Sequence, residues 1–168
     1  MCAPKGGSPS TTATSWLYLN LETKAGRAID YANVEPGDEL FVSTLARFRP
    51  GRHLELQLQQ TRHVLDRESG RLFRADLTEI RATWQFDLRT FVRWIGQRIA
   101  VDRNPALYVD EVEAASRELA NQLLFAYKIN PQTVIFAGYS DSLRDDPAGD
   151  LVRAARTLFL KLGYAWRG

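Results

Sequence analysis

Three carboxylates near the middle of the chain come closest to catalytic chemistry in type and spacing: Glu55, Asp76 and Glu79. Glycoside hydrolysis needs such a pair, one carboxylate as acid and the other as base or nucleophile. The sequence holds neither a glycine-rich phosphate loop nor a nucleophile elbow that would point to another reaction. Because the polar face of a strand accounts for these carboxylates without catalysis, we predict a non-enzymatic protein with no catalytic residue.

Two further groups of side chains have the chemistry of metal ligands. The acidic group consists of Asp141, Asp145, Asp146 and Asp150. It lacks the ordered ligand spacing of a calcium loop, so we interpret it as a solvated surface. His53 and His63 fall on one predicted strand but lie roughly 33 Å apart along it, too far to share a metal. We therefore predict no metal site and no cofactor.

Composition excludes several classes of protein. The 168 residues carry 22 Lys and Arg against 20 Asp and Glu, a balance too even for a protein that neutralises nucleic-acid phosphates. A single cysteine excludes a disulfide framework, and the 45% hydrophobic content excludes a wholly disordered chain. The longest apolar runs fall far short of the roughly 20 residues of a membrane-spanning helix.

The first fifteen residues differ in composition from the rest. They are rich in Pro, Gly, Ser and Thr and lack the apolar core of a signal peptide. We predict a disordered linker or arm over residues 1–15, followed by one structural unit over residues 16–168.

Period-two alternation dominates that unit. In GRHLELQLQQTRHV, leucines at 54, 56 and 58 alternate with Glu55, Gln57 and Gln59, which indicates a half-buried strand. Eight segments read as strands: 17–22, 40–48, 51–64, 71–86, 88–101, 123–129, 133–139 and 158–166. A helix also fits 151–162, but Tyr164 and Trp166 continue the alternation and favour a strand. A short helix within 106–117 stays open.

One segment changes its parity. From Phe73 to Leu77 the apolar residues are odd-numbered, whereas Ile80, Ala82 and Trp84 are even-numbered. One inserted residue would cause this change, so we expect a β-bulge near Thr78.

The connections favour a membrane protein. Short connections at 49–52, 86–88 and 130–131 alternate with longer polar ones at 25–37, 66–70, 103–117 and 141–150. Outer-membrane barrels have this pattern of tight turns at one end and longer loops at the other. We therefore predict an all-β, antiparallel, up-and-down transmembrane barrel of about eight strands, or the C-terminal part of a larger one.

The alternation then assigns side chains to faces. We expect lipid to contact Leu54, Leu56, Leu58, Leu123, Phe125, Leu158, Leu160 and Leu162. We expect a polar lumen to hold Glu55, Gln57, Gln59, Asp76, Arg81 and Lys161. Aromatic residues near strand ends predict an interfacial girdle of Trp84, Phe86, Tyr127, Tyr164 and Trp166. The alternative is a soluble barrel with a small ligand inside, in which the leucines at 54, 56 and 58 point inward.

Longer motifs carry a family resemblance. Lys161, Gly163 and Trp166 have the spacing of the C-terminal assembly signal of outer-membrane barrels, although Gly168 occupies its last hydrophobic position. NPQTVIFAGYSDSL followed by RTLFLKLGYAWRG resembles the closing hairpin of a bacterial family catalogued as domain of unknown function 5916. GRLFRADLTEIRATWQFDLRTFVRWIGQ resembles an earlier hairpin of the same barrel.

The resemblance implies a two-part exported protein. Family members resemble a two-domain protein, in which an N-terminal sandwich similar to carbohydrate-binding family 9 is followed by an outer-membrane barrel. It implies that this chain is the C-terminal portion of such a protein, or a truncated reading frame, in the bacterial outer membrane. The implied partners are the lipid bilayer, the outer-membrane assembly machinery and, through the N-terminal domain, carbohydrate. A weaker alternative is part of a carbohydrate-processing enzyme, and the resemblance supplies no catalytic residue.

Overall fold

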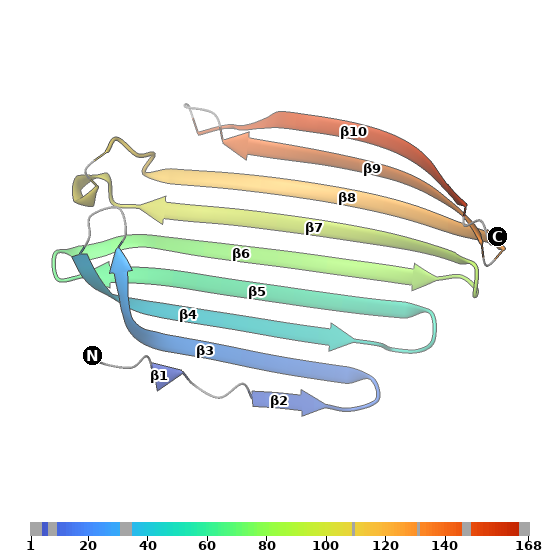
Figure 1. Ribbon diagram of the computed structural model, residues 1–168, viewed down its shortest axis with the longest axis horizontal. Coiled ribbons are helices and arrows are strands. Elements are labelled where there is room, and N and C mark those ends of the chain that lie inside the picture. Colours follow the sequence, from blue (N-terminus) through green and yellow to red (C-terminus); the bar gives the residue numbers. More distant parts are fainter. Residues whose placement is uncertain are drawn as a thin grey trace.

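The computed structural model describes residues 5–6, 10–30, 35–108, 110–130, 132–145 and 149–164, which form a single antiparallel sheet (Figure 1). Its long strands are β3 (Leu17–Asp30), β4 (Glu35–Phe48), β5 (Leu54–Arg67), β6 (Gly70–Gln85), β7 (Thr90–Arg103), β8 (Ala115–Asn130), β9 (Thr133–Asp145) and β10 (Leu151–Tyr164). Each pairs with its neighbour in sequence. Two short strands, β1 (Lys5–Gly6) and β2 (Ser10–Ala13), pair with the outer side of β3.

The prediction of an all-β antiparallel fold is confirmed. Each segment predicted as a strand overlaps one of the eight long strands, and the ambiguous segment from Leu151 onward is a strand. The only helix among the described residues is the 3₁₀ turn η1 (Pro105–Leu107), which Asn104 caps by accepting a hydrogen bond from the backbone N–H of Ala106. No helix in the described ranges is long and apolar enough to cross a membrane. Within residues 1–15, where we expected an arm, the structure places β1 and β2.

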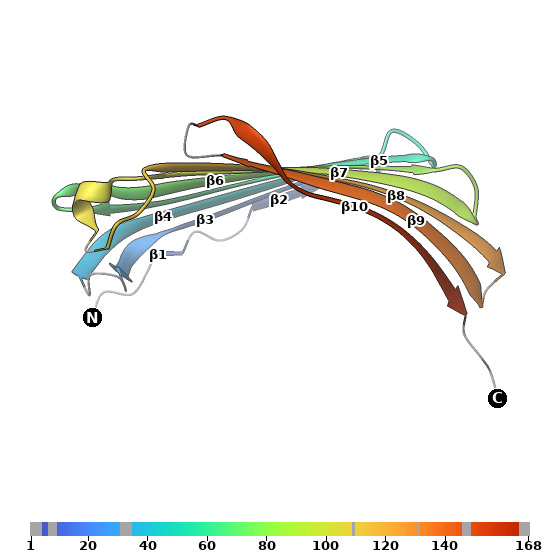
Figure 2. The ribbon, with the colours of Figure 1, turned by 90° about the horizontal axis from the view of Figure 1, so that it is seen from above.

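The sheet is a single curved layer that does not close. Among the described residues β10 pairs only with β9, so β10 is one edge of the sheet, and β3 with the short β1 and β2 forms the other. Seen from above, the sheet is an arch (Figure 2). With no second layer, few described side chains are buried: Val64, Leu65, Leu72 and Ala126 are the apolar ones.

The predicted alternation of short and long connections is wrong. The connection between β5 and β6 is the two-residue turn Glu68–Ser69, followed by Gly70 at φ 124°. By the bounds of the strands, the longest connection between two long strands joins β7 to β8, from Asn104 to Ala114. The error arises because strands continue past their apolar alternation, as β3 does from Glu22 to Asp30, where pairing with β4 supplies the backbone hydrogen bonds.

The predicted bulge near Thr78 is also wrong. Thr78 pairs regularly with Gln60 on β5 and with Arg98 on β7. The irregularity in β6 is at Leu72, which has no partner between the pairs Leu65–Phe73 and Asp66–Arg71. The change of parity therefore means that β6 is apolar on one face of the sheet near Phe73 and on the opposite face near Ile80.

Candidate functional site

The register defines two faces with different chemistry. We call the face that carries Leu54, Leu56 and Leu58 the leucine face, and the face that carries Gln57 and Gln59 the glutamine face. Residues paired across an antiparallel sheet lie on the same face, so the pairings assign every regular strand position to one of the two.

A continuous apolar band covers the leucine face on the side of the turns 49–53 and 86–89, which we call the turn side. This leucine band consists of Leu17, Leu19, Leu21, Ala46, Phe48, Leu54, Leu56, Leu58, Ile80, Ala82, Trp84, Val92, Trp94, Leu123, Phe125, Tyr127, Ile135, Ala137, Tyr139, Leu158, Leu160, Leu162 and Tyr164. Every side chain that we predicted to contact lipid belongs to it. The band is solvent-exposed even in the middle of the sheet, where Leu58 is 44% accessible, and on β10 Leu158 is 81% accessible.

The band runs obliquely to the rows of paired residues. One row crosses the eight long strands through Leu17, Phe48, Leu56, Ala82, Trp94, Leu123, Tyr139 and Leu158. On β3 the band extends from this row toward Leu21, away from the turn side. On β10 it extends from the same row in the opposite direction, toward Tyr164.

Beyond the band, the leucine face carries ion pairs beside scattered apolar residues such as Leu40, Val42 and Leu119. Asp76 accepts hydrogen bonds from Arg62 and Arg74, each at 2.7 Å, and Arg117 lies 3.1 Å from Asp145. We expected Asp76 in the lumen set, but its pairing with Arg62 places it on the leucine face. The absence of a bulge at Thr78 is the reason, since regular alternation puts Asp76 on the same face as Ile80.

On β3 to β6 the turn-side half of the glutamine face is mainly polar, whereas on β7 to β10 it also carries apolar side chains such as Phe91, Leu124 and Phe159. Of the predicted lumen residues, Glu55, Gln57, Gln59, Arg81 and Lys161 all lie on this face. Arg81 donates to Glu79 at 3.0 Å, and Glu55 forms an ion pair with Arg49. Each of the three carboxylates considered for glycoside hydrolysis, Glu55, Asp76 and Glu79, therefore contacts at least one arginine.

The other half of the glutamine face holds an aromatic cluster that the sequence analysis missed. His63 lies between Phe41 and Phe73, with ring centroids 6.2 and 5.1 Å away, and its Nε2 is 2.6 Å from the Glu39 carboxylate. Leu65 and Leu77 lie on the same face. The change of parity in β6 was the signal for this cluster, because it placed Phe73 and Leu77 opposite the leucine face.

Predicted interfacial aromatics gather at the turn side. Trp84 and Phe86 pack edge to face with centroids 6.4 Å apart, and Trp84 stacks on His53. Tyr127 and Tyr164 are exposed at the same side of the sheet. Trp166, predicted for both the girdle and the assembly signal, lies outside the described residues, whereas Lys161 and Gly163 lie in β10.

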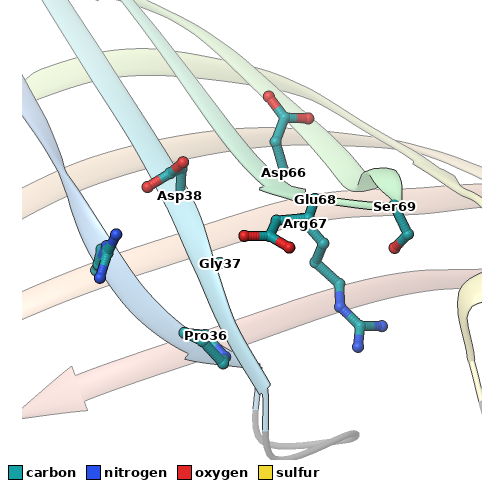
Figure 3. A pocket seen from close by; sticks show the side chains of 8 residues that line it. Pro36, Gly37, Asp38, Asp66, Arg67, Glu68 and Ser69 are labelled. Carbon is teal, nitrogen blue, oxygen red and sulfur yellow. The ribbon is translucent and has the colours of Figure 1, made fainter.

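A charged hollow of about 430 Å³ lies at the opposite end of the strands (Figure 3). Its lining comprises Arg27, Pro36, Gly37, Asp38, Asp66, Arg67, Glu68 and Ser69. Gly37 is required because a Cβ there would lie 2.9 Å from the carbonyl oxygen of Asp66. The acidic side chains are spread around the hollow, and no group of three metal-ligating side chains occurs in the described parts of the chain.

The turn between β6 and β7 is fixed by one carboxylate. Asp87 accepts hydrogen bonds from the backbone N–H groups of Arg89 at 2.6 Å and Thr90 at 2.9 Å. The Arg89 N–H is the main cause that holds the pKa of Asp87 below its ordinary value.

Comparisons with models of known families, with curated proteins and with solved structures found no match.

Proposed function

We propose that this chain forms part of the wall of a β-barrel in the bacterial outer membrane, with the leucine face toward lipid and the glutamine face toward the lumen. Its role is structural: it anchors or presents a surface module, such as the carbohydrate-binding sandwich that the family resemblance implies. The observation that carries the proposal is the continuous apolar leucine band on one face of an antiparallel sheet, whose other face is mainly polar on the turn side of β3 to β6.

The size of the band supports contact with lipid. Exposed contiguous apolar patches on soluble monomers rarely exceed a few hundred Å². This band crosses all eight long strands, and large exposed residues continue it into the turns at Trp16, Phe86 and Leu88. In water such a surface would be a site of association, whereas in a bilayer it is matched by the hydrocarbon.

The obliquity of the band supports tilted strands. The midpoint of the band moves from Leu19 on β3 to between Leu160 and Leu162 on β10, about five residues over seven strand steps. At about 3.3 Å per residue and 4.8 Å per strand, this is a tilt of about 25°. Membrane barrels tilt their strands by roughly 35–45°, and a band that is level in the membrane must cross their rows obliquely.

Crowding distinguishes the two faces. Leu56 and Leu58 are exposed, whereas Gln57 and Gln59, which alternate with them, are half-buried. Side chains converge on the concave face of a curved sheet and diverge on the convex face. The lower exposure of Gln57 and Gln59 favours the glutamine face as the concave, inner face of the barrel wall. A soluble barrel with the leucines inside would require the sheet to curve the other way.

The open edges favour a larger barrel. In hydrocarbon every backbone N–H and C=O must be paired, so a sheet that ends at β10 requires another strand beside it. We therefore propose that further strands close the wall. This agrees with the resemblance of the chain to the C-terminal barrel region of domain of unknown function 5916, and implies insertion by the outer-membrane assembly machinery.

Refolding tests the proposal directly. The urea-unfolded chain is diluted into buffer, detergent micelles or thin-lipid vesicles, and circular dichroism follows the β-structure. We expect β-structure to form only with detergent or lipid. Cooperative folding as a monomer in plain buffer would contradict membrane insertion and favour the soluble ligand-binding barrel.

A further inference from the structure

A second hollow, of about 290 Å³, lies across strands β7 to β10, which are side by side in Figure 1. Its lining is Arg93, Ile95, Gln122, Leu123, Leu124, Tyr139, Ser140 and Phe159. Six of these belong to the glutamine face. Two adjacent rows form its floor, one through Arg93, Leu124, Gly138 and Phe159, and the other through Ile95, Gln122 and Ser140.

Arg93 is the unusual side chain in this hollow. Its guanidinium forms no hydrogen bond or ion pair with any of the described residues, and its Nε is shielded from solvent. A shielded donor without an acceptor is unfavourable, and more so when it is charged. The Nε atoms of Arg47 and Arg81 are shielded in the same way, but another nitrogen of each guanidinium is bound, since Arg81 pairs with Glu79 and Arg47 donates to Gln57 at 3.4 Å.

The charges around the hollow favour an anion. The carboxylates nearest to it on the glutamine face are Glu55, Glu79 and Glu118, and each is held by another arginine. Over its described length, the glutamine face of β9 and β10 carries no carboxylate, while Lys161 adds a positive charge on β10. Arg93 therefore faces a region with excess positive charge.

The rest of the lining resembles a site for a small organic molecule. Phe159 packs over Gly138, where a Cβ would lie only 2.2 Å from the ring, so the ring forms a flat wall. Leu124 and Ile95 add apolar surface, while Gln122 and Ser140 supply an amide and a hydroxyl. A few convergent polar groups in a mostly apolar hollow are typical of small-molecule sites.

We propose that this hollow binds a small organic anion, with the carboxylate or other oxyanion group on the Arg93 guanidinium and the body of the molecule against Phe159 and Leu124. A planar guanidinium is suited to this role because it binds two oxygens of an oxyanion at once. The proposal depends on the geometry of the glutamine face alone, so it holds whether that face lines a membrane barrel or not.

Equilibrium dialysis of the folded full chain with radiolabelled benzoate tests the site, with benzyl alcohol as the uncharged analogue and inorganic phosphate as the competitor without an apolar body. We expect millimolar binding of benzoate, weaker displacement by phosphate, and no retention of benzyl alcohol. Arg93→Gln should weaken benzoate binding at least tenfold, with Arg93→Lys intermediate. Arg98→Gln is the matched control, because it lies on the same strand but on the leucine face, and should bind as the wild type does.

Each outcome decides the matter. Equal binding by the wild type and Arg93→Gln, equal retention of benzyl alcohol, or no binding by the wild type at millimolar concentration would overturn the proposal. If Arg93→Gln fails to fold, Ser140→Val replaces it as the test, because it keeps the Arg93 charge and fills part of the hollow. Binding of benzoate by Ser140→Val at the wild-type level would also contradict the proposal. The vesicle requirement for folding is measured separately, so failure of this site and failure of the membrane proposal give different results.

Discussion

Replacing Leu56 by arginine is the sharpest perturbation of the leucine band. Leu56 lies between Leu54 and Leu58, at the middle of the band on β5, and is 37% accessible in the isolated sheet. An arginine on the lipid face of a barrel costs about 2–4 kcal/mol at the bilayer midplane and about 0–1 kcal/mol near the interfaces. Since the position is central, we expect a loss at the upper part of this range in the free energy of unfolding.

Two changes on the glutamine face serve as controls. Gln59→Arg introduces the same charge on the same strand, opposite Glu79, where the new guanidinium meets a carboxylate. Gln57→Ala removes a polar group from the same face. A substitution without a lost core contact or a buried unpaired charge usually changes stability by at most about 0.5 kcal/mol, so Gln59→Arg should be nearly silent. Gln57→Ala also removes the long contact at 3.4 Å from Arg47 and should cost at most about 1 kcal/mol, less than Leu56→Arg.

The assay is unfolding by urea of chains inserted in thin-lipid vesicles, followed by tryptophan fluorescence and gel mobility. We expect Leu56→Arg to lower the unfolding midpoint and the inserted fraction, Gln59→Arg to match the wild type, and Gln57→Ala to lose less than Leu56→Arg. The same loss in Leu56→Arg and Gln59→Arg would refute our assignment of faces. No loss in Leu56→Arg would refute contact between the band and lipid.

Three further predictions concern single positions. Hydrogen bonds in the 86–89 turn lower the pKa of Asp87 in the folded protein. The stability that this carboxylate contributes is therefore complete above the unfolded pKa of about 3.9 and is lost as the pH falls through the lower folded value. In urea titrations at several pH values, the wild type should lose more stability than Asp87→Asn between about pH 5 and 2. Gly138→Val should destabilise by about 1–3 kcal/mol through collision with Phe159, and the double variant with Phe159→Ala should lose less than the sum of the two, as a double-mutant cycle would show. Leu72→Ala should lower the free energy of unfolding by about 2–5 kcal/mol because Leu72 is 1% accessible, whereas the same truncation at Leu88, which is 94% accessible, should have little effect in detergent micelles.

Alternation predicted the strands well because, along part of each strand, apolar side chains on one face alternate with polar side chains on the other. Leu54, Leu56 and Leu58 stand out against Glu55, Gln57 and Gln59, and β5 contains all six. The ends of strands were harder to predict. From Thr23 to Asp30 there is no sustained apolar alternation, and pairing with β4 rather than burial keeps these residues extended.

The same reasoning explains the misplaced residues. A change of parity in β6 has two explanations, an inserted residue or a change in which face is apolar, and only the pairing of Thr78 with Gln60 and Arg98 distinguishes them. Asp76 and the cluster around His63 were misjudged for that reason. The hollow at Arg93 draws on four strands, and its composition depends on a register that no single segment encodes.

Lipid-dependent folding, followed together with gel mobility before and after boiling, tests the central claim most directly. We predict that the chain gains β-structure only in micelles or thin-lipid vesicles. Because we propose that other strands complete the wall, we expect no shift between unheated and boiled samples, and a shift would indicate that the chain closes a barrel by itself. A monomer that folds cooperatively in plain buffer would contradict the claim that the leucine band faces lipid.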